Sequence, residues 1–219
     1  MDNSGIKVLK LNNHVLSNNP DIYVLLGNPG SGKSILIRKI FQELGGLDQP
    51  SEEERIKLLT KNKLVPILIN LKDCAFDSID NLVRSIKSDF NLTRSDLGFF
   101  YLFDGLDELS EEKVDAVLSY IHQLSLTVNG CKILLSCRKG NTNRRRLNSF
   151  FSSINEVIID DLSQTDIYSY FKGKNNKDKE KLLNKIKLVN GNLLLEIRDI
   201  LLADLLWQTI EDINESSTV

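Results

Sequence analysis

Eight consecutive residues near the N-terminus have the types and spacing of a phosphate-binding loop. They match the pattern GxxxxGK[ST] at each of its fixed positions. The residues are Gly27, Asn28, Pro29, Gly30, Ser31, Gly32, Lys33 and Ser34. Glycines let successive backbone N–H groups turn toward one anion, and the N-terminus of a following helix also favours negative charge. The loop is therefore predicted to bind nucleotide phosphates, with Lys33 on the β- and γ-phosphates and the Ser34 hydroxyl on Mg²⁺.

Three acidic residues follow an apolar run in the middle of the chain. The run FFYLF (99–103) leads directly into Asp104, and Asp107 and Glu108 follow shortly after it. An Asp at the carboxyl end of a buried strand is typical of the Walker B arrangement, which holds Mg²⁺. Either Asp107 or Glu108 could orient and deprotonate an attacking water, and the other could cap the helix that starts near Ser110. The sequence leaves both assignments open.

A single arginine ends the next apolar run. The residues ILLSC (133–137) lead into Arg138. A strand lying between the phosphate-loop strand and the Asp104 strand would bring this guanidinium to the γ-phosphate, because ligands bind at the carboxyl ends of parallel strands. We expect Arg138 to detect that phosphate. The alternative is a solvated arginine at a strand end.

The elements that must position these residues alternate between short apolar runs and amphipathic stretches. Apolar runs predict buried parallel strands over 21–27, 64–71, 99–105, 131–137 and 155–160. Apolar residues at helical spacing predict helices over 33–44, 79–90 and 114–124, and then over 164–171, 178–189 and 194–213. The predicted fold is therefore α/β: a P-loop NTPase with a five-stranded, mainly parallel sheet flanked by helices, followed by a small helical domain. The predicted parts are a lead-in over 1–19, the NTPase domain over 20–162 and the helical domain over 163–219.

The charge balance of the chain bears on whether nucleic acid is a partner. The chain has 219 residues, with 28 Lys and Arg against 30 Asp and Glu, for a formal net charge of −2. Such a balance does not indicate nucleic-acid binding by the whole chain, although a local basic patch could bind it. The basic cluster Arg144-Arg145-Arg146 is expected in a solvated loop; an arginine finger or a nucleic-acid contact is the alternative.

Cysteine usage and the absence of long apolar runs indicate the compartment. The three cysteines form no CxxC pair, and the first residues lack the apolar segment of a signal peptide. No apolar run reaches the length of a membrane span. We expect a cytoplasmic protein with reduced thiols and no membrane partner.

Taken together, the three motifs resemble a NACHT-type NTPase of the STAND class of signalling ATPases. Proteins of that family show a small residue after the Mg²⁺-binding Asp and then two further acids, as in DGLDE (104–108). The segment SCR (136–138) is similar to the family's strand-four arginine motif, and VIIDDLSQTDIYSYF (157–171) is similar to its fifth strand and the start of its helical domain. The resemblance covers residues from about 20 to about 205. A family proline expected near the adenine is replaced here by the segment NGNL (190–193).

This resemblance implies a molecular switch that binds ATP or ADP with Mg²⁺ and hydrolyses ATP slowly. It also implies self-association, or association with the rest of a larger STAND protein, in signalling or defence that includes innate immunity and anti-phage systems. The family's winged-helix domain lies outside this sequence, so we expect either a part of a larger switch or a minimal version that relies on a partner. Two alternative functions are an AAA+-like loader or remodeller of DNA or protein, and a nucleotide-binding scaffold without hydrolysis.

Overall fold

The computed structural model describes residues 22–47, 51, 53, 54, 64–73, 81, 84, 85, 98–127, 131–163, 165, 166 and 205. These residues fall into two compact units. The first holds 22–26 and the described residues from 33 to 158, and the second holds 27–32 and the described residues from 159 onward. The predicted lead-in lies outside the described residues. So do the predicted helix over 79–90 and the predicted helical domain, apart from isolated positions.

A five-stranded sheet forms the centre of the first unit. Its strands are β1 (Ile22–Gly27), β2 (Leu64–Asn70), β3 (Gly98–Asp104), β4 (Lys132–Arg138) and β5 (Asn155–Ile158). They lie in the order β2-β3-β4-β1-β5, and the pairs β1–β5, β2–β3 and β3–β4 are parallel. The predicted α/β class and five-stranded sheet are confirmed. The expected position of β4, between the strand of the phosphate loop and the strand of Asp104, is also confirmed.

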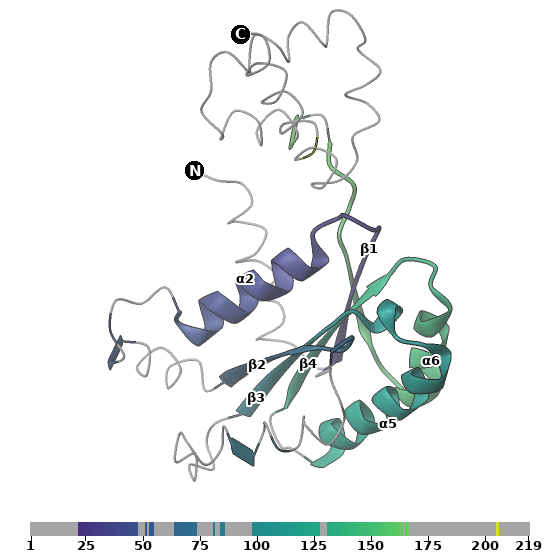
Figure 1. Cartoon of the computed structure of the whole chain (residues 1–219), viewed down its shortest axis with the longest axis horizontal. Coiled ribbons are helices and arrows are strands. Elements are labelled where there is room, and N and C mark those ends of the chain that lie inside the picture. Colours follow the sequence, from purple (N-terminus) through teal and green to yellow (C-terminus); the bar gives the residue numbers. More distant parts are fainter. Residues whose placement is uncertain are drawn as a thin grey trace, which may run out of the picture. The chain divides into compact units, whose positions relative to one another are not determined.

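Helices lie on both faces of this sheet (Figure 1). Helix α2 (Lys33–Gly45) covers one face, and α5 (Glu111–Thr127) and α6 (Thr142–Phe150) cover the other. A single 3₁₀ turn, η1 (Leu106–Glu108), follows β3 directly. Within the described part of the chain, every helix is too short or too polar to cross a lipid bilayer.

Burial on both faces explains why the central strands are continuous apolar runs rather than alternating ones. Every residue of β1 is buried, and so are the first six residues of β3. Alternate residues of the strands pack against the apolar side of α5, which contributes Val114, Val117, Leu118 and Ile121. Full burial of such a side chain contributes about 1.5–3 kcal/mol. The strand ends that carry the polar residues are therefore anchored to a well-packed core.

The structure corrects three details of the sequence-based predictions. Strand β4 includes Arg138 as its last residue, so the arginine does not lie beyond the strand. Strand β5 ends at Ile158, two residues earlier than predicted, and its residues are partly or fully exposed because it forms one edge of the sheet. The expected basic loop at 144–146 is wrong, since these arginines lie on α6, whose N-cap is Asn141. An Asn side chain that accepts the backbone N–H of residue 143 is a strong helix start.

Candidate functional site

The carboxyl ends of β3 and β4 bring together the residues that sequence motifs singled out far apart in the chain. Phe103 pairs with Leu135 in the sheet register, so the next residue of β3, Asp104, lies beside Ser136 of β4. Arg138 follows on the same strand. Side chains from separate motifs thus converge at one edge of the first unit.

The Asp104 carboxylate is oriented by a buried hydroxyl. Ser136 Oγ donates a hydrogen bond of 2.6 Å to Asp104 Oδ1 and accepts one of 2.8 Å from the backbone N–H of Gly105. Among the residues that the structure describes, none donates a hydrogen bond to the other oxygen, Oδ2. One oxygen of this carboxylate is therefore held in place, and the other is available to a cation.

The chain turns sharply after Asp104, and this turn places the two following acids. Gly105 has a φ of 90°, a conformation that other residues adopt only with strain. The turn continues as η1, in which the Glu108 N–H donates to the Gly105 carbonyl at 3.0 Å and Leu106 is fully buried. The glycine between the acids is thus required by backbone geometry.

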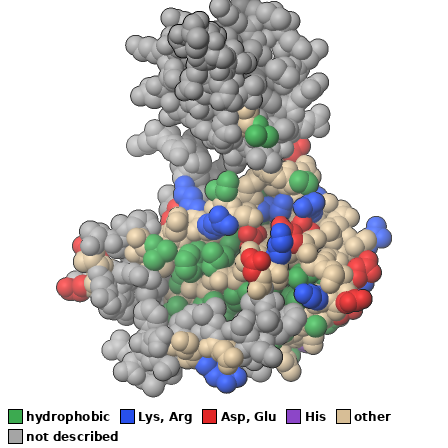
Figure 2. All heavy atoms as spheres, viewed as in Figure 1, with side chains coloured by type: hydrophobic (Ala, Val, Ile, Leu, Met, Phe, Trp, Pro, Cys, Tyr) green, Lys and Arg blue, Asp and Glu red, His purple; other side chains and the backbone are tan. Residues whose placement is uncertain are grey.

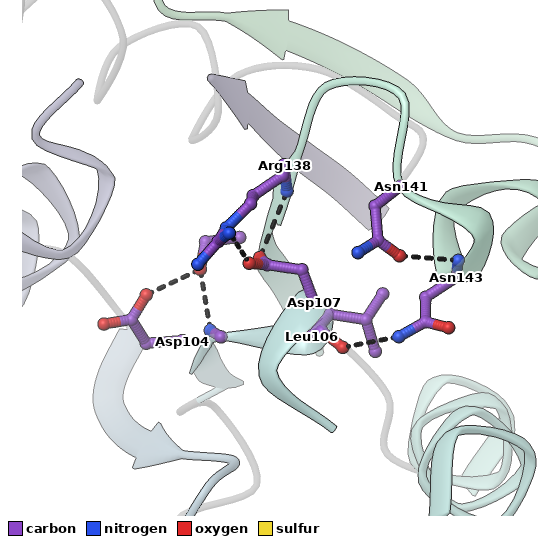
Figure 3. Close-up of polar contacts among 8 residues, drawn as sticks. Asp104, Leu106, Asp107, Arg138, Asn141 and Asn143 are labelled. Atoms are coloured by element: carbon purple, nitrogen blue, oxygen red, sulfur yellow. Dashed lines mark hydrogen bonds and ion pairs between the residues drawn. The ribbon is translucent and has the colours of Figure 1, made fainter. Parts of the chain in front are cut away.

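Asp107 and Arg138 form a two-point contact between η1 and the end of β4 (Figure 3). Arg138 Nε lies 2.6 Å from Asp107 Oδ2, and the Arg138 backbone N–H donates to Oδ1 at 3.1 Å. The Asp107 side chain is only 4% exposed, whereas that of Arg138 is 50% exposed. The arginine predicted to detect a γ-phosphate therefore has a carboxylate partner in this structure.

Glu108 differs from its neighbour Asp107 in its exposure and in its side-chain contacts. It is exposed, and its carboxylate forms no hydrogen bond or ion pair with any described residue. Neither acid caps α5, whose first turn is closed by the carbonyl of Ser110. The capping alternative is not observed for either acid.

Lys33 adds a second positive charge to the site that contains Asp104, Asp107 and Arg138. It is the first residue of α2, and partial burial lowers the pKa of its ammonium group. Asp107 is the strongest of the nearby charges that oppose this shift, Asp104 acts in the same direction more weakly, and the positive charge of Arg138 lowers the Lys33 pKa further. Ser34, next on the helix, is exposed. The ammonium, the two carboxylates and the guanidinium therefore interact electrostatically at one site.

The glycine-rich loop over 27–32, in the second unit, has the geometry of an anion-binding turn. Gly30 and Gly32 have φ values of 77° and 88°, which turn successive N–H groups toward one side. A Cβ at Gly27 would overlap the Ser31 hydroxyl, so only glycine fits there. Ser31 is buried, and its hydroxyl has no hydrogen-bond partner among the described residues. A buried donor without a partner is costly unless a ligand supplies one.

Within the same unit, this loop is tied to the segment that follows β5. Asn28 Nδ2 donates a hydrogen bond of 2.9 Å to Asp161 Oδ1. Asp161 belongs to the segment 157–171, which resembles the fifth strand of NACHT proteins and the start of their helical domain. The side chain of Asn28, a variable position of the loop motif, therefore holds the loop to this segment.

Two residues of this network were not among the predicted site residues. Asn143, which is 4% exposed, donates through its side-chain amide to the Leu106 carbonyl at 3.1 Å and so links α6 to η1 (Figure 3). Ser136 stood in the sequence as the first residue of the segment SCR (136–138) and as a polar residue inside the apolar run CKILLSC (131–137), with no role of its own assigned.

The basic cluster is largely engaged in intramolecular ion pairs. Arg144 binds Glu156 through Nε at 3.0 Å and Nη2 at 2.5 Å, and Arg146 Nη1 lies 3.2 Å from Asp115 Oδ1. Arg145 alone of the three is exposed without an ion pair among the described residues. Figure 2 shows basic and acidic side chains interspersed on the face in view. This arrangement does not favour a nucleic-acid surface.

The donor set fits a magnesium nucleotide rather than a metal held by protein alone. No group of three or more His, Cys, Asp or Glu side chains that could hold a metal occurs within the described ranges. Mg²⁺ commonly takes one or two protein oxygens and completes its shell with water and substrate phosphates. The free Oδ2 of Asp104 and the exposed Ser34 hydroxyl are suitable oxygens, and the Lys33 ammonium in the same unit suits a phosphate.

Comparison with known proteins gives one family and a set of similar folds. The sequence model described as the NACHT domain matches residues 21–178. No curated protein matches the chain. The Orc1 protein of Aeropyrum pernix, solved in complex with DNA, is 12% identical with a TM-score of 0.61, covering 100% of this chain and 62% of its own. AMPPCP-bound DnaA from Aquifex aeolicus is 16% identical with a TM-score of 0.55, covering 96% of this chain and 62% of its own.

At these identities the solved structures show the P-loop NTPase fold alone. A DnaA solved with AMPPCP and single-stranded DNA gives the same result, with 15% identity, a TM-score of 0.56, and coverage of 93% of this chain and 59% of its own. The chain thus spans about 60% of the length of these proteins.

Proposed function

The chain belongs to the NACHT domain family of P-loop NTPases, and from this membership we propose that it is an ATP-dependent switch. In this proposal ATP favours a form that associates with further copies or with a larger STAND protein, and slow hydrolysis reverses that association. The setting we propose is cytoplasmic signalling or defence, including innate immune or anti-phage defence, as in other NACHT proteins.

The contact between Arg138 and Asp107 is the observation that carries this proposal. The guanidinium is half-exposed and joins η1 to β4. A γ-phosphate offers Arg138 acceptor oxygens of higher charge than a single carboxylate, and ADP offers none at that position. A residue with different partners in the two states supplies the differential interaction that a nucleotide switch needs.

The same contact supports a role for Asp107 in hydrolysis. Its carboxylate is buried and interacts electrostatically with Lys33, whereas Glu108 is exposed. When the Arg138 guanidinium turns toward a γ-phosphate, Asp107 Oδ2 loses its donor and can accept a hydrogen bond from an attacking water, while Oδ1 keeps the Arg138 backbone N–H. We therefore assign water activation to Asp107. Bound Mg²⁺ would supply charge neutralisation at the phosphates, with Asp104 and Ser34 holding it.

Calorimetric titration of the chain with ATP and ADP, followed by light scattering, tests the proposed function. We expect both nucleotides to bind and ATP alone to increase the mass of the particle. Binding of neither nucleotide would refute the proposal. If the particle has the same mass with ATP as with ADP, the result would favour a nucleotide-binding scaffold over a switch.

Arg138→Ala is predicted to weaken ATP binding relative to ADP binding by about 1.5–3 kcal/mol, the range for hydrogen bonds to charged groups. In the proposed ATP-bound form the guanidinium contacts only the phosphate that ADP lacks, so ADP affinity should change little. Calorimetry with both nucleotides measures the difference. The matched control is Arg145→Ala, since Arg145 is an exposed arginine on α6 without an ion pair among the described residues. Equal weakening of both nucleotides would contradict the role of Arg138.

The alternative of a DNA loader rests on likeness of fold to Orc1 and DnaA. Stimulation of ATP turnover by DNA would support it. The ion pairs of Arg144 and Arg146 give it no support from the described surface.

A further inference from the structure

We propose that Ser136 is a positioning residue for the magnesium site, which presents Asp104 Oδ2 to the metal by holding Oδ1. The inference rests on the proposed function, because it assumes that Mg²⁺ binds with the nucleotide. It concerns a residue that contacts neither nucleotide nor metal in this assignment.

The direction of the two hydrogen bonds made by Ser136 Oγ follows from the number of hydrogens that each group carries. A serine hydroxyl has one hydrogen and two lone pairs. The Gly105 N–H can only donate, so its contact of 2.8 Å uses a lone pair of Ser136 Oγ. The single hydroxyl hydrogen is then free to point at Asp104 Oδ1, at 2.6 Å. The main chain of Gly105 thereby directs the serine proton to the carboxylate.

The location of Ser136 makes this orientation rigid. Ser136 is 1% exposed and lies in a strand whose other central residues are apolar. A buried hydroxyl is costly unless its hydrogen bonds are made, and here both contacts are to the end of β3. Strands β3 and β4 pair directly up to Phe103 and Leu135, so the sheet restrains the backbones that carry the two side chains.

The consequence is a carboxylate with a single free oxygen. Without Ser136, the Asp104 side chain could rotate, and binding a metal would require it to lose that freedom. Partners that orient metal ligands typically change metal affinity by about 10–100-fold when they are removed. We expect an effect of that size on Mg²⁺ and none on the phosphate contacts of Lys33.

A merely structural role for Ser136 makes a different prediction. If the hydroxyl only supported the Gly105 turn, its loss would lower thermal stability and affect nucleotide binding equally with and without metal. The dependence of ATP affinity on Mg²⁺ therefore separates positioning from support.

The experiment is a titration of the full chain with ATP in EDTA and at a series of Mg²⁺ concentrations. For Ser136→Ala we expect unchanged affinity in EDTA and a Mg²⁺ requirement raised by about 10–100-fold. Ser136→Thr keeps the hydroxyl and should restore the wild-type requirement. Cys137→Ala removes one heavy atom from a fully buried neighbour on the same strand and should behave as wild type.

Each outcome decides the inference separately from the proposed function. A wild-type Mg²⁺ requirement in Ser136→Ala, or equal weakening in EDTA and Mg²⁺, would overturn the positioning role. Absence of nucleotide binding in the wild-type chain would instead refute the proposed function. If Ser136→Ala does not fold, Ser136→Cys retains a weak donor. We then expect an intermediate Mg²⁺ requirement, and a wild-type requirement would overturn the role.

Discussion

Lys33→Ala is expected to abolish nucleotide binding. The ammonium is the charge at the start of α2 that can offset the phosphates, and Asp104 and Asp107 lie close enough to act on its pKa. Without Lys33, a polyphosphate would approach two carboxylates with only backbone dipoles and Arg138 to compensate it, which is unfavourable in a partly buried site. Titration with a fluorescent ATP analogue measures the loss.

The control for this variant is Lys39→Ala, a lysine further along the same helix that is not part of the motif. Alanine is the best helix former, so both variants should keep α2 intact. Wild-type affinity in Lys33→Ala would remove the interpretation of residues 27–34 as a phosphate-binding loop.

Changing both Asp107→Asn and Glu108→Gln should leave ATP binding intact and slow hydrolysis by about 10²–10⁴-fold, the usual contribution of a general base. The two single variants, Asp107→Asn and Glu108→Gln, should slow hydrolysis to different extents. Asp107→Asn removes the proton acceptor that is buried beside Arg138 and should account for nearly all of the loss. Glu108→Gln changes an exposed carboxylate and serves as the matched control.

Phosphate release at saturating ATP measures these rates. Wild-type turnover in the double variant would show that the pair is structural. A loss confined to Glu108→Gln would reverse the assignment and make Asp107 only the partner of Arg138.

Local patterns in the sequence were sufficient for the sheet and for a list of candidate site residues. Apolar runs predicted all five strands to within about two residues, because a strand buried on both faces must be apolar along its whole length. The loop motif between β1 and α2 predicted the positive-φ glycines, since backbone N–H groups can converge only where side chains are absent. The acid and arginine at the ends of β3 and β4 were also recognisable, because each directly follows an apolar run.

The partners of those residues could be identified only from the tertiary structure. Arg138 and Asp107 are 31 residues apart, and the sequence predicted each of them as a separate ligand contact rather than as a pair. The basic cluster was predicted to be solvated, yet Arg144 and Arg146 bind acids on β5 and α5. Such contacts depend on which strands are neighbours and in what register, and local periodicity contains neither.

The roles of Ser136 and of the two acids show the same division most clearly. From the sequence, Ser136 was the first residue of the segment SCR (136–138) without a role of its own, and Asp107 and Glu108 were equivalent carboxylates. Pairing of β3 with β4 placed the serine hydroxyl on Asp104, and the η1 turn buried Asp107 while leaving Glu108 exposed. Periodicity and motif spacing are local properties, so the sequence alone was enough to predict which chemical groups lie at this edge of the sheet. Their orientation depends on distances and angles between atoms that are far apart in the chain, and the fold brings these atoms together.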